Sequence, residues 1–333
     1  MNPVSVYVHV PFCTIKCGYC DFNAYAGMDN LKDAYRDAVL AEIAASAPLL
    51  EGRTIATVAF GGGTPGEIPA SHIAAMLSSA PFEADAEVSL EANPGTTGAA
   101  QLRELAAAGV NRVSFGAQSF DPAELRFLDR IHSPEAIEQS VGNARAAGIA
   151  SVGLDLIYGL PGQRPETFAA SLRRAIGLGV DHISLYALTV EEGTMLARRV
   201  ESGQVEPLDP DDVAAEYELA TGVLAAAGFE QYEISNWAAL ATAHDTTRST
   251  GPAETTSPSA PAPTATSTAK ATRTSPTRAP TSPASNRRVP ATPARPSCAP
   301  TSRISPPRSS TGSRSPFAAS KASTRRRSAL VSA

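Results

Sequence analysis

The sequence predicts an α/β fold, an incomplete (β/α)6 barrel followed by a disordered low-complexity tail. Between residue 4 and about residue 190, apolar runs typical of buried strands alternate with segments of helical period. Six strand–helix units in a row require a parallel sheet with helices outside it. Beyond residue 240 the chain consists almost wholly of Ala, Thr, Ser, Pro and Arg, a composition that cannot bury a core.

Each predicted strand is a short run rich in apolar residues. The strands are expected at residues 4–10, 54–63, 87–95, 112–120, 151–162 and 182–189. The segments between them space their apolar residues as amphipathic helices do. The helices are expected at residues 31–47, 71–80, 98–108, 122–128, 134–147, 165–177 and 211–227. A doubly wound dinucleotide-binding fold is the alternative, but no G-x-G-x-x-G motif follows the first strand.

Three of the four cysteines follow the first predicted strand. They are Cys13, Cys17 and Cys20, in the spacing C-x3-C-x2-C. This spacing suits a [4Fe–4S] cluster, whose irons are bound by cysteine thiolates. Because only three cysteines are local, one iron stays open to an outside ligand. An open iron indicates chemistry rather than simple electron storage.

Two other interpretations of these cysteines stay open at this point. A structural zinc site needs four ligands, so His9 or a distant residue would be the fourth. Disulfides would leave an odd cysteine, and no secretory signal precedes the three. Clustered free cysteines favour a reducing cytoplasm. No run of 18 apolar residues predicts a membrane span.

Several polar or glycine residues lie at the strand ends, where parallel α/β folds bind their ligands. The glycines at 61–63 let the backbone approach a ligand closely, although a plain strand-to-helix turn has the same pattern. Glu91 and Asp155 stand in apolar strands and need polar partners, which are either a ligand's ribose hydroxyl or ammonium group or a structural ion pair. Gln118 and Arg130 are equally compatible with ordinary rim residues.

The cysteine motif combines with Tyr19 before its last cysteine, an upstream strand containing Tyr7, and GGGTP at 61–65. Together these features resemble the radical S-adenosylmethionine (SAM) superfamily, so the expected fold is a radical SAM barrel. The resemblance implies that the open iron chelates the amino and carboxylate groups of SAM. It also implies that an electron from the iron–sulfur cluster cleaves SAM to a 5′-deoxyadenosyl radical.

Further sequence motifs point to one family within this superfamily. YVHVPFC, SLEANPG, GVNRVSFGAQSF, LDRIHS, GLDLIYGLPGQ and QYEISNWA are similar to the oxygen-independent coproporphyrinogen III oxidase-like family, from Tyr7 to about Ala238. The resemblance implies that the three cysteines bind the cluster. It also implies that the SAM pocket is lined by Tyr7, Tyr19, Gly62, Gly63, Thr64, Glu91, Gln118, Arg130, Asp155 and Ala187.

One departure separates two branches of that family. The decarboxylating dehydrogenase has a further cysteine two residues after the third cluster ligand, where this chain has Phe22, as in the heme chaperone branch. The resemblance therefore implies a protein that binds heme and delivers it to an acceptor protein, which is expected to be membrane-associated. An electron-donor protein and a second copy in a homodimer are further expected partners, and nucleic acid is not. The alternatives are an oxidase that decarboxylates the porphyrinogen coproporphyrinogen III with the deoxyadenosyl radical, and a non-functional truncated product.

The tail differs from the rest of the chain in charge. Residues 241–333 carry 14 Lys and Arg against 2 Asp and Glu, whereas residues 1–240 carry 14 against 31. We therefore expect a radical SAM core domain over residues 1–238 and a disordered tail over residues 239–333. A natural basic tail would bind nucleic acid or an acidic surface.

The genetic code favours an out-of-frame translation as the origin of the tail. Read one base out of phase from the His244–Asp245 junction, the codons allow RHNxxYW followed by GGDYF. The family has these motifs after its YEISN block, and its HNxxYW motif is associated with heme binding. A base gained or lost between about Ala238 and Ala243 would leave the chain without this motif and without the family's C-terminal domain. Cys298 would then be an accident of the wrong frame.

Overall fold

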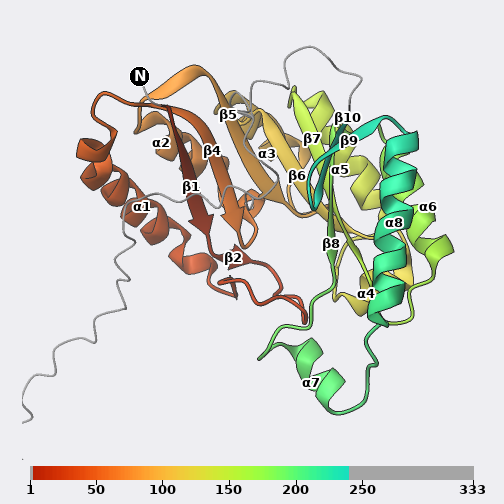
Figure 1. Cartoon of the computed structure of the whole chain (residues 1–333). Coiled ribbons are helices and arrows are strands. Elements are labelled where there is room, and N and C mark those ends of the chain that lie inside the picture. The colour runs from red at the N-terminus through yellow and green to blue at the C-terminus, as the bar shows by residue number, and fades with distance from the viewer. Residues whose placement is uncertain (1–2, 240–333) are drawn as a thin grey trace, which may run out of the picture. The chain divides into compact units, whose positions relative to one another are not determined.

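The computed structural model describes residues 3–239. Apart from Ala239, the predicted tail lies outside these residues, as do the frame-break segment and Cys298. Within the described part, eight strands form one sheet in the order β1-β4-β5-β6-β7-β8-β10-β9 (Figure 1). The first six are parallel and pair in their order along the chain. They are β1 (Pro3–Val10), β4 (Thr54–Gly62), β5 (Phe82–Ala92), β6 (Arg112–Gln118), β7 (Ser151–Tyr158) and β8 (His182–Ala187).

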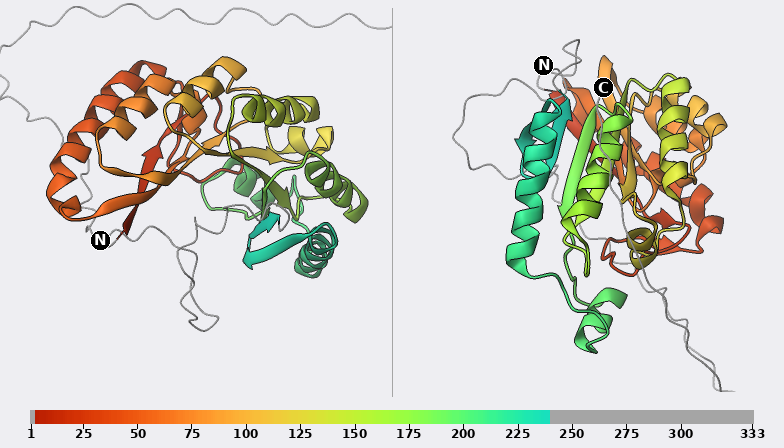
Figure 2. Two further views of the ribbon diagram at one scale, coloured as in Figure 1. Left: turned by 90° about the horizontal axis from the view of Figure 1, so that it is seen from above. Right: turned by 90° about the vertical axis from the view of Figure 1, so that its right-hand side faces the viewer.

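This strand order decides between the two predicted architectures. Right-handed crossovers between successive neighbours place all the connecting helices on the same face of the sheet. A doubly wound sheet instead reverses its strand order and carries helices on both faces. Viewed from above, the strands curve along an arc with helices on its outer side (Figure 2). The incomplete (β/α)6 barrel is therefore confirmed.

The helices begin where the sequence has capping residues. Asp121 and Ser133 accept hydrogen bonds from the first turns of α4 and α5, and each is followed by a proline at the first helical position. The α-helices are α1 (Lys32–Ser46), α2 (Ala70–Ser78), α3 (Ala99–Ala107), α4 (Pro122–Phe127), α5 (Pro134–Ala146), α6 (Pro165–Gly177), α7 (Met195–Glu201) and α8 (Pro210–Ala226). The 3-10 helices are η1 (Asp29–Leu31), η2 (Ala47–Leu50) and η3 (Pro65–Glu67). None of the helices within residues 3–239 is long and apolar enough to cross a membrane.

Five of the strands and α-helices in the described residues were not predicted. The strands β2 (Phe12–Cys13) and β3 (Tyr25–Ala26) are too short for a period to show, and α7 is a short helix in the segment after β8. The hairpin of β9 (Phe229–Glu233) and β10 (Asn236–Ala239) runs antiparallel to β8 and extends the sheet beyond its parallel part. β5 begins at Phe82 rather than at residue 87, because acidic residues interrupt the apolar pattern of its first half.

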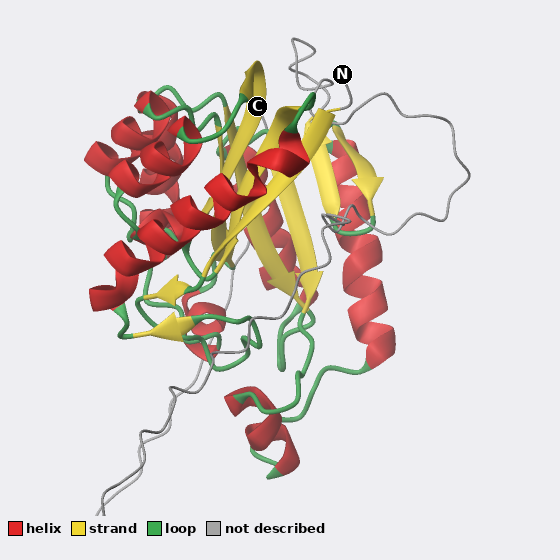
Figure 3. Cartoon of the chain, turned by 90° about the vertical axis from the view of Figure 1, so that its left-hand side faces the viewer, coloured by secondary structure: helices red, strands yellow, loops and turns green. Residues whose placement is uncertain are grey.

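The hydrophobic core lies between the sheet and the helices around it (Figure 3). Phe60, Leu90, Phe115 and Leu154 come from four consecutive parallel strands, and each is at most 1% exposed. Trp237 of β10 is also fully buried and packs beside Tyr217 of α8. Burial of each large apolar side chain contributes about 1.5–3 kcal/mol to the stability of the fold. Packing against the helices therefore supplies most of the stabilisation of these strands.

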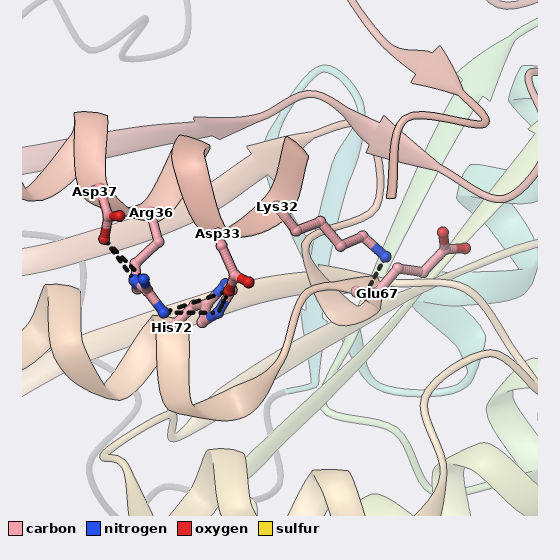
Figure 4. Close-up of polar contacts among 6 residues, drawn as sticks. All are labelled: Lys32, Asp33, Arg36, Asp37, Glu67 and His72. Atoms are coloured by element: carbon pink, nitrogen blue, oxygen red, sulfur yellow. Dashed lines mark hydrogen bonds and ion pairs between the residues drawn. The ribbon is translucent and has the colours of Figure 1, made fainter. Parts of the chain in front are cut away.

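Helix α1 anchors the start of the cysteine loop, residues 11–24, through polar contacts. Tyr35 donates from its hydroxyl to the carbonyl of His9 at 2.6 Å. Lys32 donates to the carbonyl of Glu67 at 2.8 Å, and Asp33 lies 3.0 Å from Nε2 of buried His72 (Figure 4). These contacts tie α1 to the ends of β1 and η3 and to α2, which flank the loop.

Candidate functional site

The cysteine loop occupies the C-terminal end of β1, as predicted. Cys13, Cys17 and Cys20 are free thiols and all are half-buried. The amide of Cys20 donates to the carbonyl of Cys17 at 3.1 Å, which forms a tight turn. Pairing of β2 with β3 closes the base of the loop. The three thiols are thus carried by one short, internally bonded segment.

Gly18 fixes this loop to two distant elements, and the sequence reasoning did not single it out. Its amide donates to Oδ2 of Asp129 at 3.1 Å, and its carbonyl accepts from the amide of Leu196 at 2.9 Å. A Cβ at Gly18 would lie 2.6 Å from the Asp129 carboxylate and 3.3 Å from Cβ of Met195. Only glycine fits there without a shift. The signal in the sequence was the glycine between two of the cysteines.

The donor set fits an iron–sulfur cluster better than a single zinc ion. Within residues 3–239, no three Cys, His, Asp or Glu side chains converge as ligands of one metal ion. His9, the nearby candidate for a fourth zinc ligand, lies 3.0 Å from the Tyr7 hydroxyl through Nδ1 and 2.9 Å from the Asn23 carbonyl through Nε2. A four-iron cluster binds each thiolate through a different iron and therefore needs no convergence on one atom. Burial raises the pKa of the Cys13 and Cys20 thiols, so binding iron must displace their protons.

The glycines 61–63 are required by close packing against other parts of the chain. A Cβ at Gly62, whose φ is 112°, would overlap the imidazole ring of His9. A Cβ at Gly63 would lie 2.6 Å from the carbonyl of Phe12. The amides of Gly63 and Thr64 donate to the carbonyls of Val10 and Phe12, at 2.8 and 2.7 Å. This turn therefore supports the start of the cysteine loop.

Two carboxyl groups face the concave side of the sheet. Glu91 accepts from the amide of Gly62 at 3.2 Å, and Asp155 accepts from the hydroxyl of Ser114 at 2.9 Å. The Glu91 side chain touches solvent but stands among protein atoms, and this burial together with the Asp155 charge raises its pKa to about 7. Burial also raises the pKa of Asp155. Both charges would be stabilised by a bound cation or hydroxyl.

Thr64 and Arg130 place donors beside two of the three sulfurs. The Thr64 hydroxyl lies 3.4 Å from Sγ of Cys13, and Thr64 is almost completely buried. Nη1 of Arg130 lies 3.6 Å from Sγ of Cys17. Donors in these positions can form hydrogen bonds to the sulfurs of a bound cluster. The structure thus brings these two predicted residues together with two cysteines.

The remaining predicted residues lie at the same end of the sheet. Gln118 has a φ of 65°, unusual for a residue other than glycine, and its side-chain amide lies over Gly116. Ala187 ends β8 opposite Tyr158. Tyr19 lines a cavity of about 310 Å³ with Phe127, Met195 and Arg199.

Comparison with known proteins identifies similar chains. Residues 7–175 match the family model described as the radical SAM superfamily. Heme chaperone HemW of Mycobacterium tuberculosis (strain H37Rv) is 45% identical over 243 residues, covering 71% of this chain and 62% of the relative. Heme chaperone HemW of Escherichia coli (strain K12) is 38% identical over 245 residues, covering 72% and 63%. This chain therefore spans less than two thirds of the length of these relatives.

Among solved structures, coproporphyrinogen III oxidase (HemN) from Escherichia coli, titled as a radical SAM enzyme, matches with a TM-score of 0.66. It is 31% identical in sequence, and the match covers 71% of this chain and 56% of that structure. The comparisons thus agree with the architecture built above from the residues.

Proposed function

The chain belongs to the radical SAM superfamily, and from this premise we propose that Cys13, Cys17 and Cys20 bind a [4Fe–4S] cluster with one iron left open for SAM. The three half-buried thiols on one loop support this proposal. So do the donors of Thr64 and Arg130 beside two of the sulfurs. When bound, such a cluster supplies the electron that cleaves SAM.

The SAM pocket is proposed at the C-terminal ends of the strands, on the side of the cysteine loop. Glu91 and Asp155 would hold the ribose hydroxyls or ammonium group of SAM, because the two carboxyl groups lie close enough for the Asp155 charge to raise the Glu91 pKa. Tyr7 of β1 lies beside Glu91. Gly62, Gly63, Thr64, Gln118, Arg130, Ala187 and Tyr19 complete the proposed set.

For the whole protein we propose a heme chaperone that binds heme and passes it to an acceptor. The observation that carries this proposal is the similarity to relatives named heme chaperone HemW, at 38–45% identity. Phe22 supports it, because the dehydrogenase branch has a cysteine there. Phe22 is 60% exposed, and its side chain brings no thiol to the cysteine loop. A cytoplasmic location, an electron donor, a heme acceptor and a homodimer belong to the same proposal.

Oxidative decarboxylation of coproporphyrinogen III is the second candidate, favoured by the 31% identity and TM-score of 0.66 to HemN. Anaerobic incubation of the cluster-loaded protein with SAM, a reductant and coproporphyrinogen III separates the two. We expect no protoporphyrinogen in the product analysis and, for a chain with the restored reading frame, a shifted heme absorption band on titration with heme. Formation of protoporphyrinogen would contradict the chaperone proposal.

The heme titration also needs a chain with the correct reading frame. According to the out-of-frame hypothesis, the present sequence lacks the HNxxYW motif because the codons for it are read in the wrong frame. Resequencing the gene across the codons for Asn236 to Ala265 would reveal a gained or lost base, and protein made from the restored frame is the matched sample. We expect heme binding by the restored chain, and its failure to bind heme would contradict the chaperone proposal.

A further inference from the structure

Thr64 and Arg130 come from different elements and are joined by one side chain, Asn93, which lies just after β5. Nδ2 of Asn93 donates to Oγ1 of Thr64 at 3.0 Å. Oδ1 of Asn93 accepts from Nη2 of Arg130 at 2.5 Å. The result is a continuous chain of contacts from Cys13 through Thr64, Asn93 and Arg130 to Cys17.

The chemistry of arginine fixes the direction of the two hydrogen bonds that Asn93 makes. A guanidinium only donates hydrogen bonds, so the amide oxygen of Asn93 must face Arg130. The amide NH2 group then faces Thr64 and donates to its oxygen. Because that oxygen accepts, the Thr64 hydroxyl proton is free to point at Sγ of Cys13. Asn93 thus orients a donor on each side toward sulfur.

The position of Arg130 depends on the local shape of β6. Nη2 of Arg130 also donates to the carbonyl of Gly116 at 2.6 Å. The register between β6 and β7 shifts between Gly116 and Gln118, where the backbone adopts the positive φ described above. Such a bulge leaves a backbone group outside the regular ladder. The guanidinium is therefore held at two points, Gly116 and Asn93, with Nη1 directed at Cys17.

We propose that Asn93 is a positioning residue that aims the Thr64 hydroxyl at Cys13 and the Arg130 guanidinium at Cys17, and so raises the reduction potential of the bound cluster. Hydrogen bonds to the cysteine sulfurs are one determinant of a cluster's potential, because they stabilise the more negative, reduced state. This inference rests on the proposed function, since it presumes a cluster on these cysteines. It adds a residue that touches neither the thiols nor the carboxyl groups of the proposed SAM pocket.

The test is anaerobic redox titration of the cluster, followed by electron paramagnetic resonance (EPR), in variants of the full chain. Asn93→Ala removes both bonds, and we expect a more negative midpoint potential than in the unmodified protein. Asn93→Asp should shift it further in the same direction, because the carboxylate accepts the Thr64 proton and adds negative charge. Thr64→Val removes one sulfur donor directly, so it should also make the midpoint potential more negative. This variant provides the test if the Asn93 variants do not fold. Thr64→Ser should restore the original potential.

The matched control is Thr96→Val. Thr96 donates from its hydroxyl to the backbone carbonyl of Asn93 at 2.9 Å, so its loss perturbs the same turn without removing a sulfur donor. We expect no shift in that variant. Potentials unchanged in all Asn93 and Thr64 variants that carry a cluster would overturn the inference and leave the proposed function intact. An unmodified protein that takes up no cluster would overturn both.

Discussion

The variants Cys13→Ser, Cys17→Ser and Cys20→Ser are each expected to lose the iron–sulfur cluster, while Cys298→Ser keeps it. Serine replaces a soft thiolate with a weakly acidic hydroxyl, which is a poor ligand for iron in such clusters. After anaerobic reconstitution we expect about four iron atoms per chain in the unmodified protein. The three loop variants should bind little or none. Iron content and visible absorption spectra measure the difference.

Cys298 is the matched control because it is the one cysteine outside the motif, and it also lies outside the described residues. Equal loss of iron in Cys298→Ser would show that the fourth cysteine is a ligand and that no iron is open. Retention of the full cluster in a loop variant would remove that cysteine from the proposed ligand set. Either outcome contradicts three-cysteine ligation.

A Glu91→Gln variant is expected to be more stable than the unmodified protein above pH 7 and yet to bind SAM more weakly. The pKa of Glu91 is about 7, raised from 4.5 by burial and by Asp155. The folded protein binds the Glu91 proton more tightly than the unfolded chain does, because the pKa of this carboxyl group is higher in the folded state. The free energy of unfolding therefore falls as the pH rises from 4.5 to 7. The neutral amide of the variant has no such charge to bury. We expect a melting temperature a few degrees higher at pH 8 and no difference near pH 4.5.

SAM binding should change in the opposite direction. A charged acceptor contributes about 1.5–3 kcal/mol, so its loss predicts a dissociation constant raised about 10- to 100-fold. In the unmodified protein the affinity for SAM should also fall as the pH drops through 7. In Glu91→Gln this dependence should be reduced. The Asp155 charge raises the pKa of Glu91, and the Glu91 charge in turn helps to raise the pKa of Tyr7 and Tyr186.

The control for this prediction is Glu104→Gln on the exposed surface of α3, for which we expect neither change. Thermal unfolding at both pH values and calorimetric titration with SAM are the measurements. Asp155→Asn should lower the pH at which SAM affinity is lost, because the Asp155 charge helps to raise the Glu91 pKa. Equal SAM affinity in Glu91→Gln and the unmodified protein would place Glu91 outside the pocket.

The parts of the fold that could be predicted are those determined by the local amino-acid sequence. The six parallel strands follow from apolar runs, and four of the described α-helices begin with a proline directly after the residue that caps or precedes them. The β9–β10 hairpin could not be predicted in the same way, because it is fixed by pairing with β8 and by burial of Trp237. That is a long-range effect.

The residues of the candidate site also differ in whether local sequence or long-range contacts determine their roles. The cysteine spacing and the carboxyl groups at strand ends are visible in the sequence. Asn93, Asp129 and Gly18 were missed as individual residues because their roles exist only through contacts across the barrel. Asp129 meets the amide of Gly18 from 111 positions away in the sequence. The glycines 61–63 were predicted for close approach to a ligand, and in the structure their Cβ positions are blocked by Tyr7, His9 and Phe12.

The most direct test of the central claim is EPR spectroscopy of the reduced, fully loaded protein before and after SAM is added. Three-cysteine ligation leaves one iron open, so SAM should bind that iron and change the spectrum. A spectrum that stays the same at saturating SAM, in protein with its full iron content, would mean that the fourth iron is already ligated. That result would contradict the proposed SAM-binding site.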